Sequence, residues 1–117
     1  MGRELRESST KELLLWLLRK RWRLRVTGVS MLPLLQPGEE ILVDTRAYKN
    51  ELPKLGDLVV AKHPHLANLR LIKRVSKVFE DGSCFLKGDN ALASTDSRSF
   101  GLVDSQQILG RVTSRFP

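Results

Sequence analysis

The sequence around Ser30 could hold a nucleophile. This serine lies in the segment TGVSMLP at residues 27–33, after a short apolar run and before a proline-restricted turn. Such a turn can expose a hydroxyl while backbone N–H groups point at one spot, which is the arrangement of nucleophile and oxyanion hole that acyl transfer needs. The alternative is an ordinary turn serine, and this segment alone does not decide between the two.

A nucleophilic serine needs a base, and Lys73 is a better candidate than either histidine. His63 and His65 flank a proline in a segment typical of an exposed loop, with no acidic residue placed to orient them. Lys73 lies in the extended run 69–79, where alternate side chains face alike, so it shares a face with leucines and a valine. Burial on that face would lower the pKa of the amine, and a neutral amine can accept the serine proton. The alternative is a lysine that reaches past the strand edge to water.

The polar stretch GDNALASTDSRSFG at residues 88–101 could complete such a site. It is long for a connection in a small domain, and its Asp, Ser and Arg content favours an ordered loop over a flexible linker. Asp96 and Arg98 could pair and brace the loop, and Ser94 or Ser97 could hydrogen-bond the lysine amine. The alternative is a cluster of polar turns without a chemical role.

The elements that would position these residues are strands. After residue 25 no helical period persists, and apolar runs of four to six residues alternate with turn signals, as in a mainly β fold. The predicted strands are 24–27, 40–44, 57–62, 69–79, 84–87 and 108–115. The sequence therefore predicts a compact β fold with a short N-terminal helix.

The N-terminal residues predict a basic helical arm. Ser9 or Thr10 could cap a helix, but its apolar run of six residues, 13–18, is too short to cross a bilayer. Basic residues follow the run where a signal peptide would have a cleavage site. The helix could pack three leucines (Leu14, Leu17 and Leu18) on the body, or it could lie on an anionic membrane or an acidic partner through Arg19–Arg25. A nucleic-acid reader is less consistent with the pattern, because spaced aromatic residues are lacking.

Composition limits the other possibilities. The 117 residues suit one domain, divided into a basic helical arm at 1–24 and a mainly β body at 25–117. Of the net charge of +7, residues 1–25 carry +5 (eight basic, three acidic) and the rest +2 (twelve basic, ten acidic). The single cysteine, Cys84, excludes an internal disulfide and a multi-cysteine metal site. We expect no metal, no cofactor and no transmembrane segment, and a cytoplasmic protein whose arm could touch the inner membrane face.

Four segments, in order, resemble the conserved boxes of type I signal peptidases. They are GVSMLP at 28–33, GDLVV at 56–60, IKRV at 72–75 and the GDN…SxDSR…G loop at 88–101, and together they extend over most of residues 25–115. Within that superfamily, the short chain and the wording LRLIKRV are most similar to the maturation proteases of nickel-type superoxide dismutase. The resemblance implies a serine endopeptidase of the Ser/Lys type that needs no cofactor or metal.

The resemblance also implies roles for individual residues. Ser30 matches the nucleophile, Lys73 the general base, and Ser94 the serine that orients the lysine. Asp96 and Arg98 match the pair that braces the site. Gly28 and Met31, on either side of the nucleophile, are candidate supporting residues, and the backbone N–H of Ser30 would be one oxyanion donor. Many signal peptidases have a serine donor where this chain has Gly28, so the second donor would be another group or the hole would be weaker.

Three other functions compete with this interpretation. A small signal peptidase homologue would cleave exported proteins instead of a superoxide dismutase precursor. A LexA-type self-cleaving domain shares the serine segment and a later lysine, but not the loop at 88–101. A non-catalytic adaptor with a basic arm on a degenerate peptidase fold would not need to retain Ser30, Lys73 and Ser94.

Overall fold

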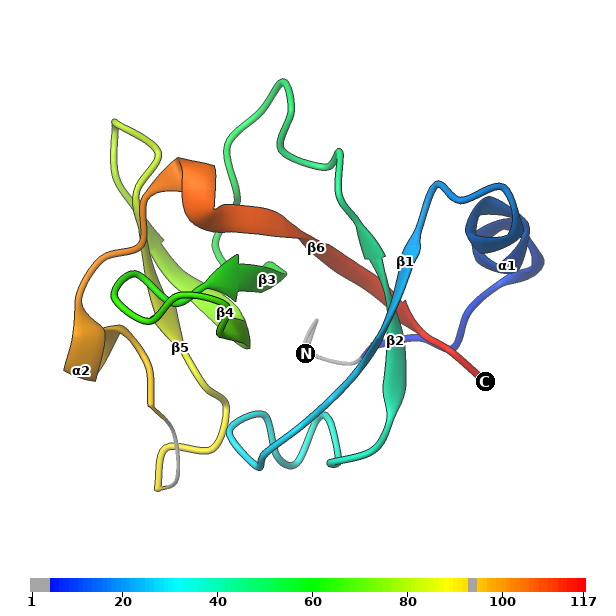
Figure 1. Cartoon of the computed structure of the whole chain (residues 1–117), viewed down its shortest axis with the longest axis horizontal. Helices are drawn as coiled ribbons and strands as arrows, with labels where there is room; N and C mark the ends of the chain where they lie inside the picture. The colour runs from blue at the N-terminus through cyan, green and yellow to red at the C-terminus, as the bar shows by residue number, and fades with distance from the viewer. Residues whose placement is uncertain (1–4, 93–94) are drawn as a thin grey trace.

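A single antiparallel sheet forms the body of the protein. In the computed structural model, which describes residues 5–92 and 95–117, six strands pair in the order β1-β2-β6-β3-β4-β5 (Figure 1). The elements in chain order are α1 (Thr10–Leu17), β1 (Trp22–Arg25), β2 (Glu40–Asp44), β3 (Leu58–Lys62), β4 (Arg70–Val78), β5 (Cys84–Lys87), α2 (Ser97–Phe100), the 3-10 turn η1 (Ser105–Gln107) and β6 (Ile108–Arg115). The mainly β fold with a short N-terminal helix is confirmed.

Two of the predictions differ from the structure by more than one residue at a strand end. The first strand is Trp22–Arg25 instead of 24–27, because it ends opposite Glu40, where its partner β2 begins. The edge strand therefore starts inside the predicted arm. The stretch 88–101 is not wholly irregular, since its end forms the one-turn helix α2, which the Asp96 side chain caps by accepting the Arg98 N–H.

The hydrophobic core lies on both faces of β3. Alternate residues of this strand belong to two clusters, Leu58 and Val60 to one and Val59 and Ala61 to the other. The first cluster includes Met31 and fixes the loop that follows β1, whereas the second packs under β5 and α2. Both segments that border the candidate site are therefore attached to a buried central strand.

Gly110 allows β6 to pass close to β2. A Cβ atom at this position would lie 2.6 Å from the backbone oxygen of Asp44, which is too short for any side chain. The position lies near irregularities in the register of β6 with both neighbours. We infer that glycine is needed here for the sheet to curl.

Helix α1 is fixed to the sheet through one side. Ser9 caps it, as predicted, by accepting the Glu12 N–H at 3.2 Å. Glu12 in turn binds Arg21, and the Trp16 ring packs edge-on against Phe116 at 4.7 Å. Of the alternatives for the arm, packing of its leucines on the body is wrong, because Leu14, Leu17 and Leu18 are exposed. Within the described residues, no helix has the length and apolarity needed to cross a membrane.

Candidate active site

Ser30 and Lys73 meet although 43 residues separate them in the sequence. The lysine Nζ lies 2.6 Å from the serine Oγ. Ser30 comes from the loop between β1 and β2, and Lys73 from the first half of β4, opposite Val59 of the buried strand β3. The sheet thus positions the lysine amine, and the loop between β1 and β2 positions the serine hydroxyl.

The surroundings of Lys73 favour a neutral amine. Only 3% of the residue is exposed, and this burial lowers the pKa of the lysine below its ordinary value of 10.5. The Asp96 carboxylate opposes the shift in part, because a nearby negative charge favours the protonated form. A lysine whose pKa is lowered in this way loses its proton more readily and is better suited to act as a base.

The loop that carries Ser30 is tied to the segment after β5. The backbone N–H of Asn90 donates to the Ser30 carbonyl at 2.8 Å, and the Asn90 side-chain amide donates to the Val29 carbonyl at 3.0 Å. The Asp89 N–H also points at the sulfur of Met31, which is buried in the core. Asn90 was missed as a positioning residue by the sequence analysis, because its hydrogen bonds depend on contacts between distant loops.

A buried ion pair holds this second segment in place. Arg74 binds Asp89 through two hydrogen bonds of 2.9 Å and donates a third, of 2.8 Å, to the Gly56 carbonyl. The sequence pattern places Arg74 on the opposite face from Lys73, which would suit a solvent-exposed side chain. The guanidinium is in fact almost fully buried, so β4 supports the site from both of its faces. The partner of Arg74 could have been identified from the Gly-Asp pair at 88–89, which directly follows the predicted strand 84–87.

Asp96 and Arg98 also lie in direct contact. Asp96 is fully buried and accepts the guanidinium of Arg98 at 2.9 and 2.7 Å and the Gly88 N–H at 3.0 Å. The neighbouring Ser97 hydroxyl accepts the Leu86 N–H at 2.8 Å instead of reaching the lysine. Asp96 therefore joins α2 to the end of β5 and also supplies negative charge near Lys73.

We expect opposite changes in the pH profile from the two members of this pair. Asp96→Asn removes the charge that raises the pKa of Lys73, so the acid limb of kcat/KM should move to lower pH by about 0.5 unit or more. Arg98→Gln leaves the carboxylate without its neutralising cation, so the limb should move to higher pH. Peptide cleavage measured across pH tests both. If both variants lose rate but the acid limb of neither profile moves, the pair has only a structural role.

The other candidate residues of the sequence analysis are Ser94 and the two histidines. Ser94 lies outside the described residues. His63 accepts N–H groups of its own loop, and His65 contacts the Phe100 carbonyl, so their hydrogen bonds do not lead to the serine. The structure therefore brings Ser30 together with the lysine and not with a histidine.

The backbone before Ser30 is suited to glycine. Gly28 has φ +75°, a conformation that side chains rarely adopt, although the space around it is open. A serine donor at this position would therefore be strained in this backbone. Among the residues that the structure describes, no acceptor pairs with the Ser30 N–H, which leaves that group available to an oxyanion.

A groove of about 330 Å³ runs past the two reactive groups. One wall comes from β1 with the following loop, and the other from Leu69 and the first half of β4. The lining residues are Leu24, Arg25, Val26, Thr27, Ser30, Met31, Leu69, Arg70, Leu71, Ile72 and Lys73. Among the residues that the structure describes, the lining is mostly apolar, with Arg25, Arg70 and Lys73 as its cations and no carboxylate.

The chain is similar in sequence to known peptidases. The family described as signal peptidase, peptidase S26, matches residues 14–78 and 76–116. Mitochondrial ATP-independent inner membrane protease subunit 1b of Arabidopsis thaliana is 34% identical over 110 residues, covering 75% of this chain and 65% of that protein. Signal peptidase IB of Staphylococcus aureus is 49% identical over 41 residues, covering 35% of this chain and 22% of that protein. The chain spans less than two thirds of the length of these relatives.

Proposed function

Because this chain belongs to the signal peptidase S26 family, we propose that it is a serine endopeptidase with Ser30 as nucleophile and Lys73 as general base. The observation that carries the proposal is the 2.6 Å separation of the serine hydroxyl from an amine that is 3% exposed. A solvated surface lysine would stay protonated at neutral pH and could not take the serine proton. Burial of Lys73 lowers its pKa and so favours the neutral amine that this step needs.

The reaction follows from this geometry. The neutral Lys73 amine accepts the Ser30 hydroxyl proton while Oγ attacks the peptide carbonyl carbon. The carbonyl oxygen becomes an oxyanion that accepts a hydrogen bond from the Ser30 N–H. As the C–N bond breaks, the lysine ammonium returns its proton to the leaving amine and an ester remains on the serine. Water, deprotonated by the same amine, then hydrolyses the ester.

The groove suits an extended peptide as substrate. β1 forms one edge of the sheet, and β5 pairs with β4 only from Arg74 onward, so the preceding residues of β4 leave an edge open beside the groove. A peptide that lies between these two edges could use backbone hydrogen bonds for affinity. Its side chains would meet the mostly apolar lining, and its scissile carbonyl would pass Ser30.

We propose that the natural substrate is a precursor protein with an N-terminal segment to be removed. The sequence resemblance makes the cytoplasmic precursor of a nickel superoxide dismutase the first candidate, in which cleavage would expose the nickel-binding N-terminus. The similarity to signal peptidase IB supports exported proteins as the second candidate. In both cases the protein substrate is cut once near its N-terminus.

Co-expression with each precursor tests the proposal. The intact mass of the product should fall by one discrete segment with the wild-type enzyme and stay unchanged with Ser30→Ala, which removes only the nucleophile. Processing of the signal-peptide precursor alone would favour the second substrate. If Ser30→Ala protein processes a precursor as fast as wild type, the assignment of the nucleophile is wrong. If the folded wild-type protein binds a precursor without cutting it, an adaptor function replaces the peptidase.

A further inference from the structure

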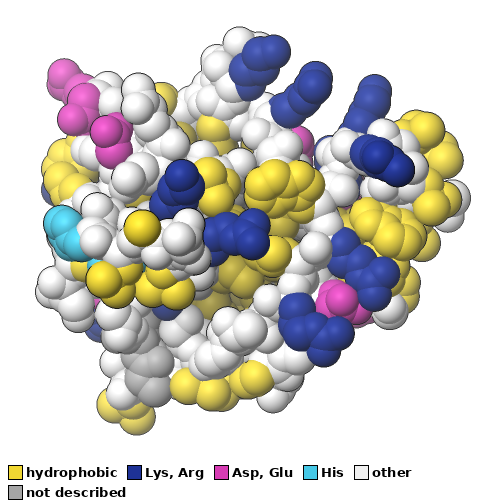
Figure 2. Space-filling model, in the orientation of Figure 1, with side chains coloured by type: hydrophobic (Ala, Val, Ile, Leu, Met, Phe, Trp, Pro, Cys, Tyr) yellow, Lys and Arg dark blue, Asp and Glu magenta, His cyan; other side chains and the backbone are white. Residues whose placement is uncertain are grey.

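Helix α1 presents a row of exposed leucines. Leu14, Leu17 and Leu18 are 55%, 67% and 59% exposed, and their spacing of three and four residues places them on one face of the helix. The opposite side of α1 is held by Trp16 against Phe116. In Figure 2 apolar side chains gather over the end of the molecule where Figure 1 shows α1. Apolar groups exposed together in this way indicate an interaction surface.

Unpaired cations flank this leucine face. Lys11 precedes the leucines, and Arg19 and Lys20 follow them; all three are exposed, and none is within ion-pair distance of a carboxylate in residues 5–92 and 95–117. The later arginines of the arm behave differently. Arg21 pairs with Glu12 and Asp44, and Arg23 and Arg25 both pair with Glu40. The available positive charge is therefore concentrated beside the leucines and not along the whole run Arg19–Arg25.

We propose that this α1 surface, Leu14, Leu17 and Leu18 with Lys11, Arg19 and Lys20, docks on an anionic lipid bilayer. An apolar helical face bordered by Lys and Arg is the pattern of helices that lie in the membrane interface. The leucines project outward and do not line the neighbouring hollow, which is formed by Trp16, Trp22 and four arginines with Leu24. Convex apolar side chains enter a fluid bilayer without a complementary pocket, whereas an acidic protein partner would have to supply one.

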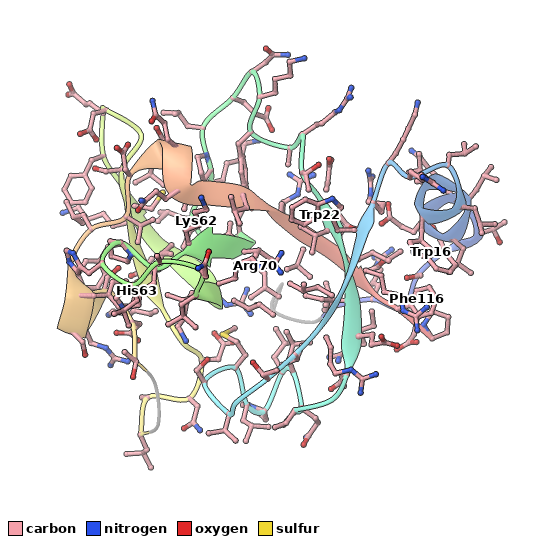
Figure 3. All side chains as sticks on the ribbon, in the orientation of Figure 1. Trp16, Trp22, Lys62, His63, Arg70 and Phe116 are labelled. Carbon is pink, nitrogen blue, oxygen red and sulfur yellow. The ribbon has the colours of Figure 1, made fainter. Side chains whose placement is uncertain are left out.

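Docking would place the groove beside the membrane surface. Leu24 and Arg70 line both the active-site groove and the hollow next to α1. Figure 3 shows Arg70 of β4 and Trp22 of β1 close together between these two strands, and the arginine lies 5.9 Å from the centre of that indole ring. A peptide emerging from or anchored in the bilayer would then have a short path to the groove. The docking itself does not depend on the proposed peptidase function.

Vesicle flotation with the full chain tests this surface. Wild-type protein should float with vesicles of phosphatidylcholine and phosphatidylglycerol, bind vesicles of phosphatidylcholine alone about tenfold less, and dissociate at high salt. Wild-type protein that stays unbound on anionic vesicles overturns the proposal.

Matched double variants locate the contact. Leu17→Glu with Leu18→Glu, and separately Arg19→Gln with Lys20→Gln, should each reduce vesicle binding by about tenfold or more. Leu55→Glu with Leu66→Glu is the control, because these leucines are similarly exposed but belong to loops outside the arm. All of these positions are solvent-exposed, so the variants should fold. Equal vesicle binding by the Leu17/Leu18 variant and the control variant would overturn the proposal.

Discussion

Replacing Lys73 with methionine is expected to slow peptide-bond cleavage by about 10³-fold or more while the protein stays folded. Methionine keeps the length and the apolar stem of the lysine but has no group that can take the Ser30 proton. Because the lysine is almost fully buried, an apolar side chain should be accommodated in its place without loss of stability. The measurements are single-turnover cleavage of a precursor and thermal unfolding of both proteins.

The wild-type pH profile should identify the same amine. Cleavage should increase as pH rises through the lowered pKa of Lys73, because only the deprotonated form accepts the proton. The stability should respond in the same direction. Between that lowered pKa and 10.5 the unfolded lysine binds more protons than the folded one, so the free energy of unfolding rises with pH. Lys73→Met should lack this contribution.

Lys77→Met serves as the control for the lysine assignment. Lys77 lies on the same strand β4 but is exposed, with its amine over the Phe79 ring. This variant should keep wild-type rates and the wild-type pH profile. Equal activity of Lys73→Met and Lys77→Met would rule out the buried lysine as the base, whatever the role of Ser30.

The sequence was sufficient for the strands but not for the attachment of the arm. Alternating apolar residues between turn signals predicted most strand boundaries to within two residues, because that pattern follows directly from which side chains are buried. Leu14, Leu17 and Leu18 carry the same apolar signal, yet they are exposed. Hydropathy indicates that a side chain tends to be buried, but it does not indicate which side chains of a helix contact the rest of the protein. In α1 these contacts are made by Trp16, which packs on Phe116, and by Glu12, which pairs with Arg21.

The site shows the same limit. Local patterns suggested Ser30 and Lys73 separately, and the pairing of Asp96 with Arg98 follows from their closeness in the sequence. The contact of Asn90 with the Ser30 loop and the burial of Arg74 could not be predicted, since both depend on how distant loops fold together. A strand pattern assigns Arg74 to a face but does not reveal that Asp89 covers that face.

Removing Asp89 should therefore cost more stability than its position in a loop suggests. Asp89→Ala leaves the buried Arg74 guanidinium without its two carboxylate hydrogen bonds, and we expect the free energy of unfolding to fall by about 3–5 kcal/mol. Cleavage should also decrease at temperatures where the variant is folded, because the Asp89-Asn90 segment holds the backbone of Ser30. Chemical denaturation and cleavage assays measure the two effects.

The double variant Arg74→Leu with Asp89→Leu separates a buried charge from a lost contact. If the cost of Asp89→Ala comes from an uncompensated guanidinium, removing both charges should restore most of the lost stability. Glu40→Gln weakens an ion pair on the exposed edge strand β1 and should change stability far less, since solvent screens it. Stability restored without activity would assign Asp89 to the placement of Ser30 as well as to the fold. A double variant no more stable than Asp89→Ala would instead mean that the segment is held by its backbone contacts.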